Sequence, residues 1–204
     1  MKILKILGID LAGREENPTG ICILNNQKIV FKSLYTNTEI FEEIKSIKPN
    51  LIVIDAPLSL PKGRCCLEKD CECALKGHFR QSEREIRIYG RVLPLTFKGM
   101  KILALRGIGL AARLQGTYDV LETHPRTTQK ILKLQNPEKE LFEYFKWETE
   151  PSKHELDALL SALTGLLYHK NCYIALGNRE EGFIIIPKDN DCIKRFGSQY
   201  LGIN

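Results

Sequence analysis

Two aspartates that follow short apolar runs are the strongest chemical signal in this chain of 204 residues. Asp10 ends the run Ile6-Leu7-Gly8-Ile9, and Asp55 ends the run Leu51-Ile52-Val53-Ile54. Continuous apolar runs of this length predict strands buried on both faces, so both carboxylates should lie at the carboxyl end of a central sheet. If the strands are parallel neighbours, about 4.8 Å apart, the carboxylates repel each other unless a cation lies between them. The pattern therefore predicts a metal site.

Two further acids and a histidine could complete the site. Glu122 ends a third predicted strand, over 118–122, and Asp157 lies on a predicted helix with His154 three residues before it on the same face. His154 could bind the metal or transfer a proton. Oxygen ligands suit Mg²⁺ or Mn²⁺, and two such ions about 3.5–4 Å apart can promote phosphodiester hydrolysis. The expected metal ligands are Asp10, Asp55, Glu122 and Asp157, and the expected catalytic residues are these four with His154.

Three of these residues also have a simpler explanation. Asp10 precedes a glycine-containing turn, where an aspartate can hydrogen-bond to its own backbone. Glu122 could pair with Arg126 or Lys130, and His154 at a helix start could be solvated. Asp55 is harder to explain away, because a carboxylate at the end of a fully apolar strand needs a partner.

The elements that must position these residues follow from the apolar pattern. Residues 21–31 predict a hairpin, and Thr38 is a candidate cap for a helix that ends near Pro49-Asn50, before the strand that carries Asp55. A strand, a crossover helix and a second strand make a parallel pair. Ser152 and Glu155 form a capping-box pattern at the start of the helix that carries Asp157. Further helices are predicted over 79–89 and 96–115, and a candidate C-terminal hairpin over 172–187.

The predicted fold class is therefore α/β, with a central mixed five-stranded sheet in which three antiparallel strands are followed by two parallel additions, flanked by helices. A chain with 43% hydrophobic residues and this length can bury one substantial core. We expect a single domain over 1–204, with a cysteine-containing loop or helical insertion at about 56–95.

This order of elements is that of the ribonuclease H-like fold, and four segments carry a closer resemblance. Residues 8–20, 54–61, 121–125 and 153–159 resemble the predicted nucleases of the domain-of-unknown-function family 429, over roughly residues 6–170. The segment His154-x-x-Asp157-Ala-Leu is similar to the last helix of RuvC-type resolvases, where a metal-binding acid follows another ligand by three positions. The resemblance implies a nuclease of the ribonuclease H-like fold.

Basic residues could bind the phosphates of a nucleic acid. Arg80, Arg84 and Arg87 are spaced so that one helix face would carry them all, with Arg91 a further turn along. The alternative is a solvated face moderated by neighbouring glutamates. A net charge of +5 is compatible with a polyanionic partner but decides little alone. The expected nucleic-acid contacts are Arg14, Arg80, Arg84, Arg87 and Lys153; DNA and RNA are not distinguished.

Four of the seven cysteines cluster at Cys65, Cys66, Cys71 and Cys73, with His78 close behind. They offer enough soft ligands for a structural Zn²⁺, although the usual spacing of two residues between paired cysteines is missing. A local disulfide and inert thiols are the alternatives. An odd cysteine count without a secretion signal argues against a disulfide framework.

Two other function classes stay open. The glycine-containing turn from Asp10 to Gly20 also resembles the first phosphate loop of the actin-like phosphotransferases, and a noncatalytic binding module could keep the same fold. No apolar stretch reaches the length of a membrane span, and the amino-terminal residues run into a strand. We therefore expect a cytoplasmic protein without membrane contact, and the sequence leaves a homodimer open.

Overall fold

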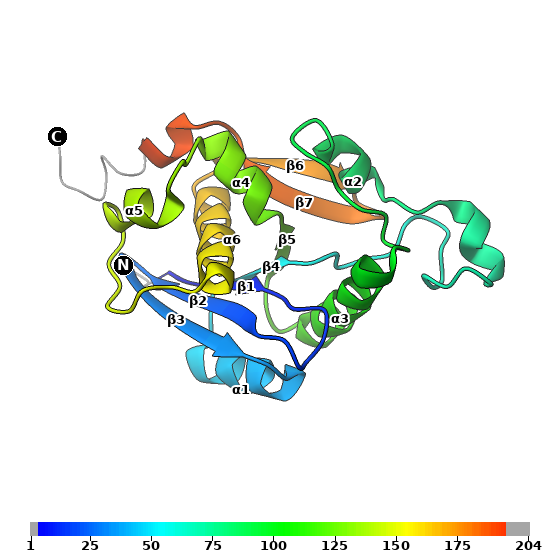
Figure 1. The fold of residues 1–204 in the computed structure, drawn as a ribbon, viewed down its shortest axis with the longest axis horizontal. Helices are drawn as coiled ribbons and strands as arrows, with labels where there is room; N and C mark the ends of the chain where they lie inside the picture. The colour runs from blue at the N-terminus through cyan, green and yellow to red at the C-terminus, as the bar shows by residue number, and fades with distance from the viewer. Residues whose placement is uncertain (1–3, 195–204) are drawn as a thin grey trace.

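The computed structural model describes residues 4–194, and within them the chain forms a mixed sheet covered by helices on both faces (Figure 1). The sheet order is β3-β2-β1-β4-β5-β7-β6. The strands are β1 (Lys5–Asp10), β2 (Thr19–Asn25), β3 (Lys28–Leu34), β4 (Leu51–Asp55), β5 (Val120–Thr123), β6 (Tyr173–Asn178) and β7 (Gly182–Pro187). The helices are α1 (Asn37–Ile47), the 3-10 helix η1 (Glu72–Lys76), α2 (Gln81–Ile86), α3 (Lys98–Leu114), α4 (Pro125–Leu132), α5 (Pro137–Phe142) and α6 (Lys153–His169).

The sheet has seven strands among the described residues, so the prediction of five is corrected. β1, β2 and β3 form the expected antiparallel meander, and β4 and β5 add in parallel. The expected C-terminal hairpin is confirmed as β6 and β7. It continues the main sheet, because β7 pairs in parallel with β5 and covers an edge that would otherwise be unpaired.

Two apolar cores lie on opposite faces of the sheet. On one face, Ile6 of β1 and Val53 of β4 pack against α6, together with residues of α4 and α5. On the other face, Ile9 and Ile54 pack against α1 and α3. Consecutive residues of a strand point to opposite faces, so the alternation along β1 and β4 decides which face each aspartate meets.

Local sequence explains where the helices near the site begin. Ser152 caps α6 with the predicted capping box to Glu155. The crossover helix α1 is capped by Thr36 in place of the predicted Thr38, because the Glu39 side chain returns to the Thr36 backbone and completes a second capping box. α2 ends at Ile86, earlier than the predicted helix over 79–89.

A disulfide joins Cys172 to Cys192, which the sequence did not predict. It ties the residue before β6 to the segment after β7. None of the helices in residues 4–194 is long and apolar enough to cross a membrane.

Candidate active site

Asp10 and Asp55 face each other at the carboxyl ends of two parallel strands, as their sequence positions predicted. β1 and β4 are neighbours, and their register pairs Asp10 directly with Asp55. Asp10 lies four residues after Ile6 and Asp55 lies two residues after Val53, and strand residues two or four positions apart point to the same face. Both aspartate side chains therefore point to the face that α6 covers. The strand pairing that the metal hypothesis required is therefore confirmed.

Two glycines let α6 approach this face closely enough to bring its first turns to the aspartates. A Cβ added at Gly8 would lie 2.0 Å from the Ala158 carbonyl oxygen, and one added at Gly20 would lie 2.1 Å from that of His154. Any side chain at either position would push the helix away from β1 and β2. The close contact places His154 and Asp157 beside the sheet edge.

His154 is hydrogen-bonded to the first aspartate. Its Nδ1 lies 2.6 Å from Asp10 Oδ2, and its side chain is half exposed while that of Asp10 is mostly covered. The imidazole therefore has one nitrogen on the carboxylate and its outer edge toward solvent. From this position it could orient Asp10 or exchange a proton with a reacting group.

The acids of this edge are held in an environment that disfavours their charge. Burial raises the pKa of Asp55 well above its usual value, and repulsion from Asp10 and Asp157 adds to the effect. Burial also raises the pKa of Asp10 and the pKa of Asp157. At Asp10, the hydrogen bond with His154 opposes this rise. Among residues 4–194, no donor lies within hydrogen-bonding distance of the Asp55 carboxylate and no basic side chain pairs with it.

These residues fit a divalent cation site. A cleft of about 360 Å³ is lined by Asp10, Asp55 and Asp157 with His154 at its side. An unpaired, partly buried carboxylate beside a second one needs a cation or a proton, and oxygen donors suit a hard cation. Among the described residues, no three of the acids bring ligand atoms within 4.8 Å of one another, so they spread over the cleft without closing a tight cage.

Glu122 is placed differently from the prediction that it joins the two aspartates. The register pairs it with Ile54, one residue short of Asp55, so its side chain leaves the sheet on the opposite face. There it forms a buried ion pair with Arg80, whose Nη1 lies 2.8 Å from Oε2, and it accepts a hydrogen bond of 2.9 Å from the Leu58 amide. Burial raises the pKa of Glu122, and Arg80 opposes that shift. Its carboxylate also borders the cleft, but its charge is already compensated.

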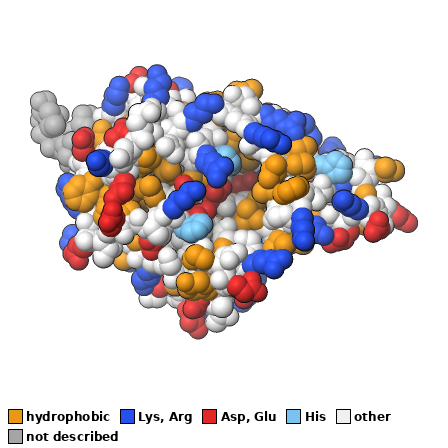
Figure 2. Space-filling model, viewed as in Figure 1, with side chains coloured by type: hydrophobic (Ala, Val, Ile, Leu, Met, Phe, Trp, Pro, Cys, Tyr) orange, Lys and Arg blue, Asp and Glu red, His pale blue; other side chains and the backbone are white. Residues whose placement is uncertain are grey.

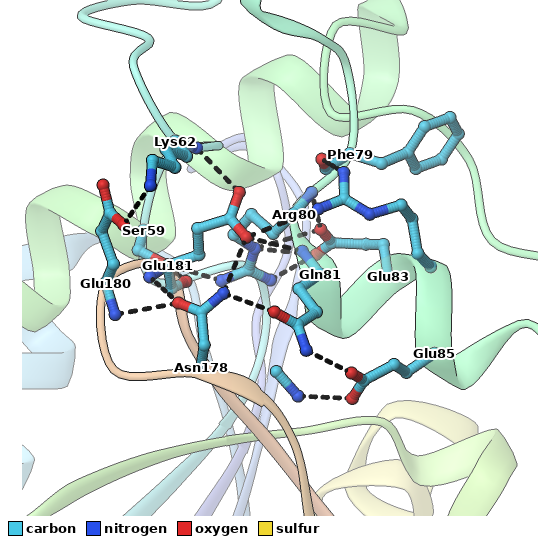
Figure 3. A network of polar contacts seen from close by, with 12 residues as sticks. Ser59, Lys62, Phe79, Arg80, Gln81, Glu83, Glu85, Asn178, Glu180 and Glu181 are labelled. Carbon is cyan, nitrogen blue, oxygen red and sulfur yellow. Dashed lines mark hydrogen bonds and ion pairs between the residues drawn. The ribbon is translucent and has the colours of Figure 1, made fainter.

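A polar network holds Arg80 in this place (Figure 3). Arg80 donates to Glu83 and, at 2.8 Å, to the Ser59 hydroxyl, which in turn donates to the Glu181 carbonyl. The Glu181 carboxylate accepts from the backbone amides of Lys62 and Gln81 at 2.8 and 2.9 Å. Burial would raise the pKa of Glu181, but these backbone hydrogen bonds lower it. The network joins the segment after β4, the start of α2 and the turn before β7.

The expected basic stripe for nucleic acid does not form. Arg80 is fully buried, so its guanidinium offers nothing to a phosphate, and this prediction is corrected. Arg84 donates to the Phe79 carbonyl at 2.6 Å and lies 3.6 Å from Glu181, while Arg87 lies over the Phe79 ring at 4.0 Å. Arg14 is exposed on the turn after β1 and does not line the cleft, whereas Lys153 does.

Two arginines line the cleft: Arg91, which the sequence analysis placed at the end of the basic stripe, and Arg126, which it considered only as a partner for Glu122. Arg126 favours the charged forms of all three aspartates. The sequence carried a signal for Arg126, because it lies three residues after the end of β5, near the edge of the sheet that carries Asp10 and Asp55. In Figure 2, acidic atoms in the middle of the face are surrounded by lysine, arginine and histidine side chains. A second depression, of about 650 Å³, shares Arg91, Val92 and Leu93 with the cleft and is also lined by Phe79, Arg87 and Lys130.

Away from the cleft, the structure also brings the four clustered cysteines together. The sulfurs of Cys65, Cys66, Cys71 and Cys73 all lie within 4.8 Å of one another, and all four thiols are free. His78 is not part of this group, because its Nδ1 is hydrogen-bonded to the Thr96 hydroxyl.

Comparison with known proteins supports the fold. T. thermophilus RuvC, solved in complex with a Holliday junction substrate, has a similar structure, with a TM-score of 0.50 over 82% of this chain and 96% of the RuvC chain. The fold is ribonuclease H-like. Only 14% of the aligned residues are identical, so the likeness to RuvC concerns the fold alone. No protein-family model and no curated protein matches the sequence, so the resemblance to family 429 has no support from these comparisons.

Proposed function

We propose that this protein is a metal-dependent nuclease that hydrolyses phosphodiester bonds in nucleic acid with two Mg²⁺ or Mn²⁺ ions. The observation that carries the proposal is the facing pair of Asp10 and Asp55 beside α6, with no cationic partner for Asp55 among residues 4–194. The RuvC-like fold agrees with this assignment.

In this proposal the three aspartates hold the ions. Asp10 and Asp55 would contribute from the sheet and Asp157 from α6, and all three line the cleft. Bound ions would activate a water and stabilise negative charge on the attacking and leaving oxygens. Carboxylates spread over a cleft suit two ions about 3.5–4 Å apart better than one ion in a closed cage.

The remaining residues of the cleft have two roles, proton transfer and substrate binding. His154 keeps Asp10 in orientation and exchanges a proton with the reacting oxygens from its exposed edge. Lys153, Arg126 and Arg91 bind the phosphates near the reacting bond. Glu122 acts as a positioning residue, because its carboxylate is committed to Arg80.

The nucleic acid would continue from the cleft into the neighbouring depression. Arg91 and Leu93 belong to both, and Arg87 and Lys130 add positive charge farther along. Such contacts bind the backbone without reading sequence. Because the RuvC structure contains a Holliday junction, a four-way DNA junction is the first substrate to test, beside duplex DNA, single-stranded DNA and RNA.

The test compares cleavage of these substrates by the purified protein with Mn²⁺, with Mg²⁺ and with EDTA. Asp10→Asn and Asp55→Asn should abolish cleavage and weaken Mn²⁺ binding in calorimetry. Asp119→Asn is the matched control, because Asp119 is exposed and precedes β5 at the other end of the sheet. Cleavage that persists in Asp55→Asn would refute the proposal. Nucleic-acid binding with no metal binding would favour a noncatalytic module.

The cytoplasmic location and the homodimer expected from the sequence stay predictions. Cell fractionation and light scattering of the purified protein would check them.

A further inference from the structure

Residues 63–77, in the segment between β4 and α2, bury few of their side chains. This segment projects from one end of the molecule, at the right of Figure 1. Between Gly63 and Gly77 only Arg64, Leu67 and Cys73 are buried. A segment that buries so few side chains usually needs a covalent or metal cross-link to hold one conformation.

Four cysteine sulfurs meet inside this segment. Cys65 Sγ lies 3.4 Å from Cys71 Sγ, Cys66 Sγ lies 3.6 Å from Cys73 Sγ, and the sulfurs of Cys71 and Cys73 are 3.2 Å apart. All four lie within 4.8 Å of one another. A tetrahedral zinc ion with sulfur at about 2.3 Å would set the sulfurs about 3.8 Å apart, so these three contacts need to lengthen only slightly.

The arrangement differs from that of two ready disulfide pairs. Cys71 contacts both Cys65 and Cys73, and Cys73 contacts both Cys66 and Cys71, so the sulfurs form one group. A polynuclear iron–sulfur cluster would hold its cysteine sulfurs farther apart, because they bind different irons. One ion at the centre matches the observed geometry best.

Arg64 gives the site a compensating charge. Its guanidinium donates four hydrogen bonds of 2.9–3.0 Å to backbone carbonyls, those of Cys66, Glu68, Ala74 and Gly77. No carboxylate in the described part of the chain forms an ion pair with it. A divalent ion with four thiolates carries a net negative charge, which a buried arginine beside it stabilises.

We propose that Cys65, Cys66, Cys71 and Cys73 bind one structural Zn²⁺ that holds residues 63–77 in their folded form. The segment leads directly to Arg80 and to the cleft wall at Arg91. The Leu95 amide is hydrogen-bonded to the His78 carbonyl at 3.0 Å, which joins the end of the cysteine segment to that wall. The zinc site does not depend on the nuclease proposal, because none of the four cysteines lines the acidic cleft.

The first test measures the metal content of the full-length protein, purified without chelators, by inductively coupled plasma mass spectrometry. About one zinc per chain is expected. Replacement of zinc by Co²⁺ should give the intense sulfur-to-metal charge-transfer absorption of a tetrahedral thiolate site. Iron in place of zinc, or a reduced protein that takes up neither zinc nor Co²⁺, would overturn the proposal.

The second test uses variants. Cys65→Ser and Cys71→Ser should lose the bound zinc, and neither of these two cysteines is fully buried. Cys22→Ala is the matched control, because Cys22 is a free cysteine in the main core and should leave the zinc in place. Zinc retained equally by all three variants would refute the assignment. If the serine variants fail to fold, the metal content and Co²⁺ spectrum of the unaltered protein still decide it.

Discussion

Arg80 and Glu122 form an ion pair that is almost fully shielded from water, although the two residues are 42 positions apart in the sequence. The Arg80 side chain has no exposed surface, and it also binds Glu83. This pair, built around a residue that was expected to bind phosphate, supports the wall of the acidic cleft. Its removal would leave two buried carboxylates without a cation.

The first prediction follows from this pair. Arg80→Met should lower the free energy of unfolding by about 3–5 kcal/mol, because one partner of a buried pair is left uncompensated. Arg84→Met is the control: Arg84 is more than half exposed and should cost at most about 1 kcal/mol. Urea unfolding followed by circular dichroism measures both. Equal losses of unfolding free energy in the two variants would show that the buried ion pair contributes no more to stability than an exposed arginine.

A second prediction concerns pH and metal at Asp55. The pKa of Asp55 is raised above 3.8 in the folded protein, so its protonated form favours folding, and that contribution is lost as the pH rises through the folded pKa. Without divalent cations, Asp55→Asn should therefore be more stable than the unaltered protein at about pH 8, with the difference shrinking toward about pH 5. Each unit of pKa shift corresponds to about 1.4 kcal/mol.

Added Mn²⁺ should reverse that order. The unaltered protein gains stability from binding the ion, whereas Asp55→Asn has lost a ligand and should gain much less. Thermal unfolding in EDTA and in Mn²⁺, at several pH values, gives the comparison. A variant that is less stable than the unaltered protein in EDTA at high pH would contradict the burial argument.

The third prediction addresses His154. His154→Gln should lower kcat for nucleic-acid cleavage by about 10²-fold, because the proton-transfer group beside Asp10 is lost, while the folded structure is kept. His169→Gln provides the control, since His169 is exposed at the far end of α6. Steady-state kinetics with Mn²⁺ would measure the effect. If kcat is unchanged and only KM rises, His154 binds substrate and takes no part in proton transfer.

The fourth prediction tests the close approach of α6. Gly8→Ala should destabilise the fold by about 1–3 kcal/mol or more, because its Cβ would overlap the Ala158 carbonyl at 2.0 Å. Gly109→Ala, on α3, meets nothing within 4 Å and should instead stabilise the protein by up to about 1 kcal/mol. Differential scanning calorimetry would separate the two. A Gly8→Ala protein of undiminished stability would mean that α6 can shift away from β1 without cost.

Parts of the fold and site could be predicted because their signals are local. The apolar runs before Asp10 and Asp55 predicted neighbouring parallel strands, and the Ser152 capping box predicted the start of α6. The sheet was predicted two strands too short, because nothing local reveals that a C-terminal hairpin joins a sheet at its β5 edge. The free thiols and the Cys172–Cys192 disulfide could not be told apart from spacing alone.

The sequence by itself determined which residues end strands and which begin helices, since hydrophobic periodicity and capping act over a few neighbouring positions. Only the tertiary structure decided which of those residues share a site. A one-residue difference in register turns Glu122 to the opposite face from Asp55, and burial converts Arg80 from a surface cation into the partner of Glu122. Register and burial depend on contacts between distant segments, and the chemistry of a carboxylate depends on both.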